Sequence, residues 1–325
     1  MADNVSEVSV FGKWIQVPSL TVGDKTIVIT GRWIKKATVR SEAWLETELE
    51  NPDICIQRLK AERRHGVRAD IFTFTQKIPG TPPKYDYCCE LESIAAVRIT
   101  SFNDWWEGLP QEARKNVRRA EKRGVGIVVR PFDDDLIRGI ASINDASSVR
   151  QGVRNYHYGK SFEQVKKDHA SFIDRSDFLC AYFGDEMIGY LKLVHRGEVS
   201  SILNLATKAS HYDKRPANAL IAKAMEICGS RGVSYLTYGL FNYGNKGDSP
   251  LRQFKIRNGF QEIMLPRFYI PLTPFGTVVM KLKVHRGMIG ILPHSVITLA
   301  ANIRRTLRSL QLRIESQNSN PTTSV

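Results

Sequence analysis

Residues 200–238 constrain the fold of this chain more than any other stretch, because their pattern reads as strand, helix, strand. Residues 200–207 and 233–238 are short apolar runs of the kind found in strands. Between them, residues 214–228 carry apolar side chains three and four positions apart, which is typical of an amphipathic helix. A strand that returns through a helix to its neighbour gives a parallel pair with a right-handed crossover. We therefore expect a partly parallel sheet covered by a helix.

The residues around this unit predict a mixed sheet. Residues 178–183 and 187–194 are apolar runs joined by a Gly-Asp-Glu turn, which is the pattern of a hairpin. Further along, Ser249 and Pro250 mark the beginning of a short helix and Gly259 marks its end. A last strand is expected at residues 261–271. The predicted fold class is α/β (α+β), a mixed sheet with flanking helices.

The first half of the chain has weaker patterns. It predicts strands at residues 8–17, 26–29, 71–74 and 87–99 and helices at residues 41–49 and 53–64. Asn103 is the expected N-cap of a helix that continues to Gly124. Asp133 is expected to cap the helix after that, and Ser161 with Gln164 has capping-box spacing for a helix running toward residue 174.

The positive charge of the chain is concentrated in two segments. The 325 residues include 47 Lys and Arg against 33 Asp and Glu, a formal net charge of +14. Residues 111–123 hold six basic and two acidic residues, and from Lys281 to the C-terminus seven basic residues face one acidic residue. Such clusters indicate an anionic partner: a phosphorylated cofactor, RNA or an anionic membrane surface. A solvated helix face is the competing interpretation of a basic helix.

Several classes of function lose their support in the sequence. It contains no Walker-type phosphate loop, no G-x-G-x-x-G after a strand, no G-x-S-x-G and no paired C-x-x-C. We therefore expect neither nucleotide hydrolysis, hydride transfer nor a bound metal. The five cysteines are odd in number and irregularly spaced, which favours a reducing cytoplasm. No apolar run is long enough to cross a membrane.

Three stretches of the chain resemble a known superfamily. Residues 199–232 read VSSILNLATKASHYDKRPANALIAKAMEICGSRG and resemble the central strand, pyrophosphate loop and helix of the GNAT acyltransferases. Residues 249–260, SPLRQFKIRNGF, resemble the last helix of that superfamily. Residues 109–125, LPQEARKNVRRAEKRGV, resemble the basic helix of its Fem-type (FemAB-like) branch, whose members carry two GNAT-like domains. The resemblance covers about residues 103–272.

The resemblance implies a division of the chain into three parts. Residues 1–125 would be a degenerate N-terminal GNAT-like domain or an unrelated cap that ends in the basic helix. Residues 126–275 would be the GNAT-like acyltransferase domain. Residues 276–325 would form a basic amphipathic helix, with apolar positions from Val296 to Ile314, followed by a disordered tail.

The donor site implied by the resemblance departs from the superfamily pattern. The usual loop is Gln/Arg-x-x-Gly-x-Gly/Ala, whose glycines let backbone N–H groups approach a pyrophosphate. Tyr212, Arg215 and Ala217 occupy these positions here. Lys214 and Arg215 could hold phosphate by side-chain charge instead. The expected donor-site residues are Asn204, Thr207, Tyr212, Lys214, Arg215, Ala217 and Asn218.

Two candidate catalytic residues follow. Lys255, preceded by Phe254, stands where many GNAT enzymes have a tyrosine, and Fem-type proteins resemble the chain in this Phe-Lys pair. Its ammonium would stabilise the oxyanion of acyl transfer, unless it is a lysine on the solvent face of a short helix. His157, in the polar loop 150–160, could act as general base toward an amine, unless it is a solvent-exposed loop residue.

The acceptor site is expected near two loops. Residues 150–160 and 238–248 are rich in aromatic, polar and basic side chains, and loops of this kind often bind ligands, although the second could be a flexible glycine loop. The candidate substrate-binding residues are Arg150, Tyr158, Tyr238, Asn242, Tyr243 and Phe254.

The sequence thus predicts an acyltransferase that uses acyl-CoA as co-substrate and a small-molecule or peptide-like amine as acceptor, with no permanently bound cofactor. One alternative is a Fem-type aminoacyltransferase dependent on aminoacyl-tRNA, with tRNA on the basic helix between Arg114 and Arg123. Another is a non-catalytic binding module of the same fold. The C-terminal helix could pack on the protein or pair two copies in a homodimer. It could also bring a cytoplasmic protein into peripheral contact with the inner surface of the membrane.

Overall fold

The computed structural model describes residues 5–10, 12–41, 48–63, 67–78, 80–150, 153–242 and 249–286. The chain divides into two compact units, Met1–Leu272 and Thr273–Val325. The domain boundary expected after residue 125 falls inside the first unit, at the beginning of β7 (Val125–Arg130), the strand that follows α4 (Gln111–Lys122).

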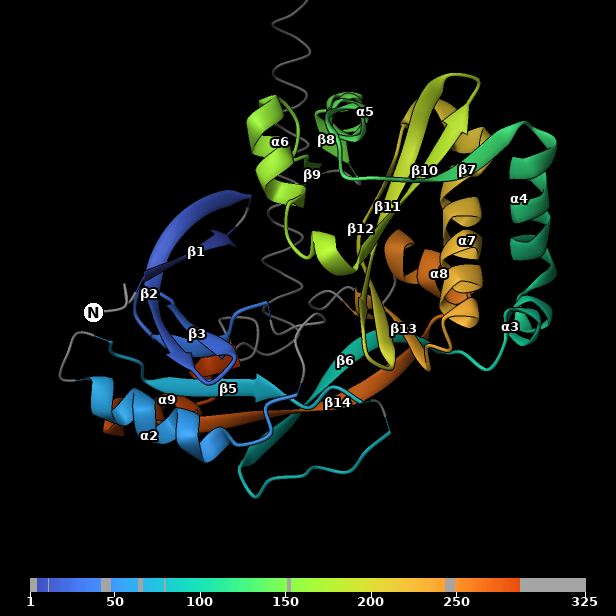
Figure 1. The fold of residues 1–325 in the computed structure, drawn as a ribbon. Helices are drawn as coiled ribbons and strands as arrows, with labels where there is room; N and C mark the ends of the chain where they lie inside the picture. The colour runs from blue at the N-terminus through green and yellow to red at the C-terminus, as the bar shows by residue number, and fades with distance from the viewer. Residues whose placement is uncertain are drawn as a thin grey trace, which may run out of the picture. The chain divides into compact units, whose positions relative to one another are not determined.

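The N-terminal strands form an antiparallel ribbon that ends in a parallel pair (Figure 1). They are β1 (Val5–Val10), β2 (Lys13–Val22), β3 (Lys25–Thr30), β4 (Lys36–Val39) and β5 (Ile71–Thr75). The single strand predicted at residues 8–17 is wrong, because the chain reverses at Gly12, whose φ of 76° suits glycine. Helix α2 (Pro52–Glu62) buries Cys55, Ile56 and Leu59 in the core beneath these strands.

In the part of the chain that the structure describes, twelve strands form one sheet in the order β1-β2-β3-β4-β5-β14-β6-β13-β12-β11-β10-β7. Its centre consists of β6 (Cys88–Arg98), β13 (Tyr235–Leu240) and β14 (Gln261–Pro271). Strand β14 lies between β5 and β6 and pairs antiparallel with both. The last strand of the unit therefore joins the N-terminal strands to the rest of the sheet.

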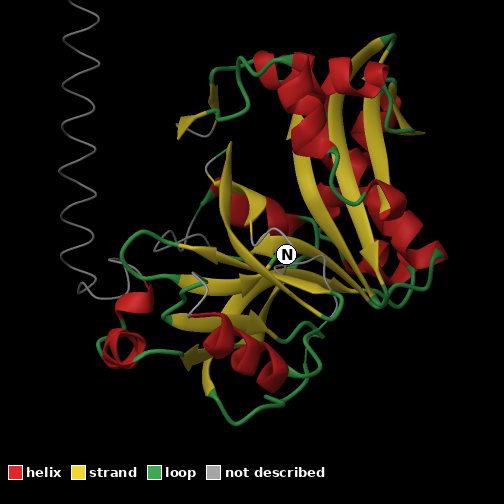
Figure 2. Ribbon diagram, turned by 60° about the vertical axis from the view of Figure 1, so that its left-hand side comes forward, coloured by secondary structure: helices red, strands yellow, loops and turns green. Residues whose placement is uncertain are grey.

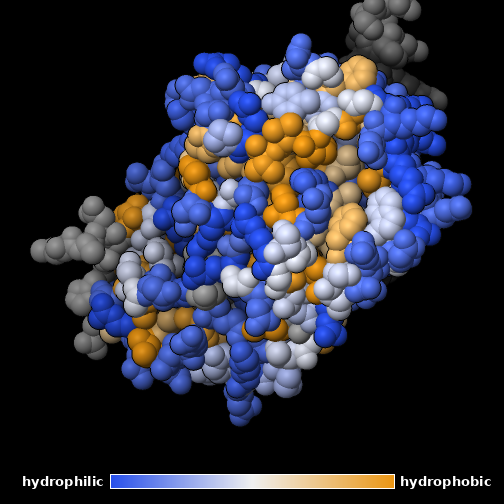
Figure 3. Space-filling view, turned by 45° about the vertical axis from the view of Figure 1, so that its right-hand side comes forward, coloured by the Kyte–Doolittle hydropathy of each residue, from blue (hydrophilic) through white to orange (hydrophobic). Residues whose placement is uncertain are grey.

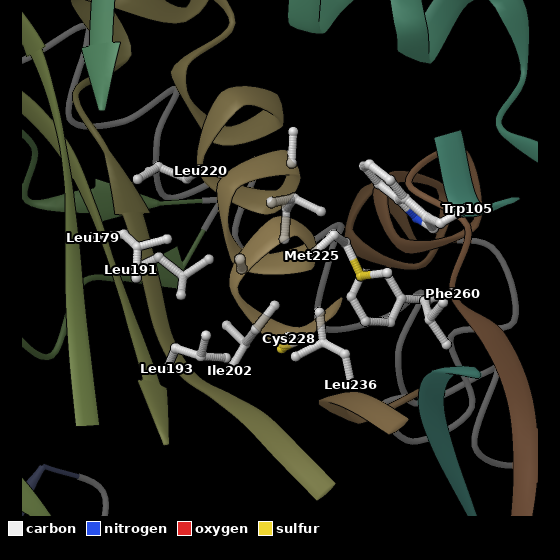
Figure 4. Packing of buried hydrophobic residues seen from close by; sticks show 14 of the residues in the cluster. Trp105, Leu179, Leu191, Leu193, Ile202, Leu220, Met225, Cys228, Leu236 and Phe260 are labelled. Carbon is white, nitrogen blue, oxygen red and sulfur yellow. The ribbon is translucent and has the colours of Figure 1, made fainter. Parts of the chain in front are cut away.

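The other half of the sheet confirms the predicted strand, helix, strand unit. It contains β10 (Ser176–Phe183), β11 (Glu186–Arg196) and β12 (Val199–Thr207), and β12 pairs parallel with β13 through the crossover helix α7 (Pro216–Ser230). Apolar residues of α7 lie between the sheet and a second apolar layer (Figure 4). Leu220 and Cys228 are fully buried there, near Leu191 on the sheet side and Phe260 on the other.

The remaining helices flank this half of the sheet (Figures 1 and 2). They are α3 (Phe102–Gly108), α4, α5 (Asp134–Asp145), α6 (Phe162–His169) and α8 (Pro250–Arg257). The expected caps Asp133 and Ser249 and the capping box of Ser161 with Gln164 are confirmed. The single helix expected from Asn103 to Gly124 is wrong. Its N-cap is Ser101, and Pro110, which has no N–H to donate, separates α3 from α4.

Short elements complete the described chain. Strands β8 (Val149–Arg150) and β9 (Val153–Arg154) form a small hairpin, and the 3₁₀ helix η2 (Ile173–Arg175) follows α6, which ends before the expected residue 174. In the second unit, the hydroxyl of Thr273 caps α9 (Pro274–Lys281), and η4 (Val284–Arg286) comes next. The predicted helix between Val296 and Ile314, the tail and residues 42–47 of the predicted helix 41–49 lie outside the described residues. No described helix is long and apolar enough to span a membrane.

Candidate active site

Strands β12 and β13 separate near the middle of the sheet. They pair only at Val199 with Tyr235, Ser200 with Leu236 and Ser201 with Thr237, although both strands continue beyond these pairs. Just past this point β12 has an irregular register with β11, where Lys192 pairs with Asn204 and Leu193 pairs with Ile202. Leu203 is the extra residue of this bulge. Each of the two cavities described next is lined in part by β12 beyond the separation.

The first cavity, here called the β12–β13 cavity, has a volume of about 240 Å³. Leu205 and Ala206 of β12, with Pro250 and Leu251 of α8, supply an apolar part of its lining. Six of the residues predicted for the site line it as well: Arg150, Thr207, Tyr212, Ala217, Tyr238 and Phe254. The structure therefore brings together predicted donor and acceptor residues that lie up to 104 positions apart in the chain.

The loop before α7 contains a residue with a backbone conformation that favours glycine. Arg215, at the position of the first loop glycine, has φ 59° and ψ 39°, a left-handed conformation that glycine adopts most easily. Pro216 follows as the first helical residue and has no N–H. The N–H of Arg215 donates to the carbonyl of Tyr212 at 3.2 Å, and that of Asn218 donates to Arg215 at 3.1 Å. Few backbone donors at this helix end thus remain for an anion.

Cationic side chains lie on this loop and along the neighbouring helix α4. Lys214 Nζ lies 4.6 Å from the centre of the Phe183 ring, and Arg215 is exposed. Arg123, at the end of α4, donates to the carbonyl of Asp213 at 2.6 Å and to its carboxylate at 3.0 Å. This contact fixes the C-terminal end of the basic helix α4 against the loop. Along α4 the exposed cations recur three and four positions apart: Lys115, Arg118 and Lys122.

Asn218 lies in the interior instead of the cavity. Its side-chain amide donates to the side-chain oxygen of Asn258 at 3.0 Å. The backbone carbonyl of Asn258 in turn accepts a hydrogen bond from the indole of Trp105 at 3.1 Å. These contacts tie α7, the end of α8 and α3 together, so the structure gives Asn218 a role in holding the site's framework.

Lys255 is fully buried, so its interpretation as a lysine on the solvent face of α8 is wrong. Its ammonium donates to the carbonyl of Leu240, at the end of β13, at 2.6 Å. It also lies 4.6 Å from the centre of the Tyr238 ring. Burial lowers the pKa of Lys255 from 10.5 to about 8. Since Tyr238 lines the β12–β13 cavity, a positive charge stands directly behind one wall of that cavity.

The second cavity, here called the β1–β12 cavity, is larger, at about 600 Å³. Residues of the β1–β2 hairpin form one side of it, and Leu203 and Asn204 of β12 lie on another. His157 lines it too, half-buried, with Nδ1 at 3.9 Å from a carboxylate oxygen of Asp168. Burial, reinforced by the positive charge of Lys160, lowers the pKa of His157 below its ordinary 6.5. Its imidazole is therefore neutral near pH 7 and can accept a proton.

Asp168 connects the two sides of the β1–β12 cavity and was not identified from the sequence. Its carboxylate accepts a hydrogen bond from the indole of Trp14 at 2.8 Å and pairs with Lys160. Lys160 also donates to the carbonyl of Gly12 at 3.0 Å. Trp14 and Asp168 are 154 residues apart, so no local pattern in the sequence signals their contact.

Two other predicted residues, Tyr158 and Asn242, line neither cavity. Tyr158 is half exposed. The side-chain amide of Asn242 donates to the carboxylate of Glu262 at 2.8 Å. Tyr243 lies outside the described residues. Among the described residues, no group of three or more His, Cys, Asp and Glu side chains is arranged to hold a metal ion.

Comparison with known proteins establishes the fold. No protein-family model and no curated protein matches the chain. The C-terminal domain of a protein described as a lysylphosphatidylglycerol synthetase, from Agrobacterium fabrum, is 13% identical with a TM-score of 0.57 over 82% of this chain and 88% of its own. FemX is 10% identical with a TM-score of 0.55 over 81% and 87%. L-PGS from Bacillus licheniformis is 15% identical with a TM-score of 0.53 over 84% and 89%.

These similarities confirm the predicted fold class, a GNAT-like mixed sheet with flanking helices, and show that the chain shares its fold with these three structures. The first of these structures matches 82% of the chain. The sequence resemblance covers only about residues 103–272, which is a smaller part of the 325 residues. Part of the remaining chain therefore belongs to the shared fold as well.

Proposed function

We propose that this chain is an aminoacyltransferase that takes an aminoacyl group from aminoacyl-tRNA and transfers it to an amine acceptor. The sequence alone favours acyl-CoA as donor, with tRNA as the alternative. Two of the structures with TM-scores above 0.5 are the lysylphosphatidylglycerol synthetase domain and FemX. The name of the first refers to the transfer of a lysyl group, and the name of the second refers to the Fem type. Their similarity over more than four fifths of the chain supports aminoacyl-tRNA over acyl-CoA as the donor.

The observation that carries the proposal is the loop at the beginning of α7. A compact pyrophosphate cradle needs several backbone N–H groups that point at the anion. Here Pro216 supplies none, and the N–H of Arg215 is used within the loop. Side-chain cations replace these backbone donors. Such cations suit an extended polyanion, whose charges are spread over many phosphates, better than the single pyrophosphate of coenzyme A.

The basic helix α4 extends this cationic surface. The contact of Arg123 with Asp213 places the end of α4 at the same loop, and Lys115, Arg118 and Lys122 continue along the exposed side of the helix. In the space-filling view turned toward this side of the molecule, hydrophilic side chains surround a central hydrophobic area (Figure 3). An RNA backbone lying along α4 would lead its end to the β12–β13 cavity.

The two cavities suit the two halves of the reaction. Leu205 to Thr207 line the β12–β13 cavity and Leu203 and Asn204 line the β1–β12 cavity, so a donor in the first and an acceptor in the second would meet at β12. The amine attacks the ester carbonyl, forming a C–N bond, and the ester C–O bond breaks. The proton that the amine loses ends on the ribose oxygen, which leaves as a hydroxyl. His157 would accept the proton of the attacking amine, and the charge of Lys255 would favour the oxyanion.

The proposal is tested by offering the purified protein charged tRNAs with labelled amino acids, or labelled acyl-CoA thioesters, with simple amines as acceptors. We expect labelled amide product from charged tRNA. We also expect tRNA binding that weakens steeply with salt, and weakens further in Arg118→Gln and Lys122→Gln. Lys60→Gln, an exposed change on α2, is the matched control and should bind as the wild type does. Product from acyl-CoA alone would make coenzyme A the donor, and no product from either would favour a binding module.

A further inference from the structure

A buried lysine that the proposed mechanism does not use lies behind the β1–β12 cavity. Lys192 on β11 is fully buried, and its ammonium donates to the carbonyl of His169, the last residue of α6, at 2.8 Å. It also donates to the carbonyl of Ser171, and its distance to the hydroxyl of Ser171 is 3.4 Å. The ring of Phe178 lies 5.1 Å away. No carboxylate of the described residues forms an ion pair with Lys192.

Two features of this region are unfavourable in isolation. An ammonium removed from water without a carboxylate partner is costly, and burial lowers the pKa of Lys192 to about 8. Phe172, directly after Ser171, has φ 56° and ψ 34°, a left-handed conformation that is unfavourable for a residue other than glycine. Strain of this kind persists where neighbouring contacts hold it, and it is concentrated at functional sites. Here Lys192 holds the corner formed by Ser171 and Phe172.

This corner faces the β1–β12 cavity. Ser171 and Phe172 both line the cavity, together with Asn204, the cross-strand partner of Lys192. The hydroxyl oxygen of Ser171 accepts from the ammonium, so its own proton remains to be donated to another acceptor. The buried charge of Lys192 polarises this hydroxyl and makes it a stronger donor.

The charges around the cavity favour an anion. Each lining carboxylate already has a lysine, Asp168 with Lys160 and Glu7 with Lys167. Arg40, which also lines the cavity, and Lys192 behind it take part in neither pair. Positive charge is therefore in excess among the described residues at this cavity, and the ammonium of Lys192 lies 3.4 Å from the hydroxyl oxygen of Ser171.

We propose that the corner formed by Ser171 and Phe172, positioned by Lys192, binds an anionic oxygen of the acceptor, a carboxylate or a phosphate. The acceptor would accordingly carry such a group in addition to its amine. This inference rests on the proposed function in assigning the acceptor to the β1–β12 cavity. The anion binding itself requires no turnover, so the two can fail separately.

The test uses the Trp14 side chain, which lines the cavity, as a reporter. The full chain is labelled with 5-fluorotryptophan, and the fluorine resonance of Trp14 is assigned by its absence in Trp14→Phe. Inorganic phosphate and acetate are titrated separately at constant ionic strength. We expect the resonance to shift saturably with at least one of them, and the stronger of the two identifies the acceptor's anionic group.

Variants of Ser171 then locate the anion. Loss of a hydrogen bond to a charged group should raise the apparent Kd about tenfold in Ser171→Ala, whereas Ser171→Thr, which keeps the hydroxyl, should retain binding. Ser9→Ala removes a hydroxyl from another part of the same cavity lining and should bind as the wild type does. An unresponsive Trp14 resonance, or equal affinity in Ser171→Ala and wild type, would overturn the inference. Turnover measured on the same preparations decides the proposed function independently.

Discussion

Replacing Lys255 by methionine tests whether a buried ammonium stands behind the β12–β13 cavity. The side chain is fully buried, and its pKa falls from 10.5 to about 8 on burial. Between these two values the unfolded chain binds a proton at this site and the folded chain does not. The contribution of Lys255 to the free energy of unfolding is therefore constant below about pH 8 and rises as the pH increases toward 10.5.

The magnitude follows from the two pKa values. One pH unit across this window corresponds to about 1.4 kcal/mol, so the wild type should gain about 2 to 3 kcal/mol from Lys255 between pH 7 and pH 10. Lys255→Met has no proton to lose and gains nothing. The free energy of unfolding of the variant minus that of the wild type should therefore be about 2 to 3 kcal/mol higher at pH 7 than at pH 10.

Urea denaturation followed by circular dichroism at both pH values measures the difference. Lys122→Met, which removes an exposed lysine from α4, is the control and should change the free energy of unfolding equally at both. If Lys255→Met also differed from wild type equally at pH 7 and pH 10, the ammonium would be hydrated and the argument for its position behind Tyr238 would fail.

Two further predictions concern the other site residues. Because the pKa of His157 is lowered by burial and by Lys160, kcat/KM of the wild type should fall only below about pH 6.5. In His157→Gln the rate should be about a hundredfold lower and this fall at acidic pH should be absent. Initial rates measured over a series of pH values test both expectations. Asn218→Ala should reduce the free energy of unfolding by about 1 to 3 kcal/mol in urea denaturation, because it leaves the side-chain oxygen of Asn258 buried without its donor. Asn103→Ala, at an exposed position, should have a far smaller effect, and equal losses in the two variants would contradict this reasoning.

Local chemistry explains which elements the sequence predicts well. The helix after Ser249 and the strand Gln261–Pro271 are found at the expected residues, because a capping hydroxyl, a proline and an alternating pattern act within a few positions. Strand β13 (Tyr235–Leu240) begins two residues later than expected. The reversal at Gly12 was missed because apolar and polar residues alternate on both sides of it.

The expected residues that line a cavity are those indicated by a superfamily motif or by a polar, aromatic loop. Six of the expected residues meet in the β12–β13 cavity, and each comes from a strand, loop or helix with a recognisable pattern. The contact of Trp14 with Asp168 has no such pattern, because the chain must fold before distant residues meet. Lys192 did leave a signal, since it is a lysine inside the apolar run 187–194. A charge in a buried strand requires partners, and this requirement could have directed attention to Ser171.

The position of β14 between β5 and β6 has a consequence for synthesis of the chain on the ribosome. A nascent chain that ends before Gln261 contains all its neighbours but leaves one edge of β5 and one edge of β6 open. Open strand edges are templates for pairing with other chains. The two arms of the sheet can be joined only when Pro271 has left the exit tunnel, so this protein must complete its sheet late, after nearly all of its first unit has been made.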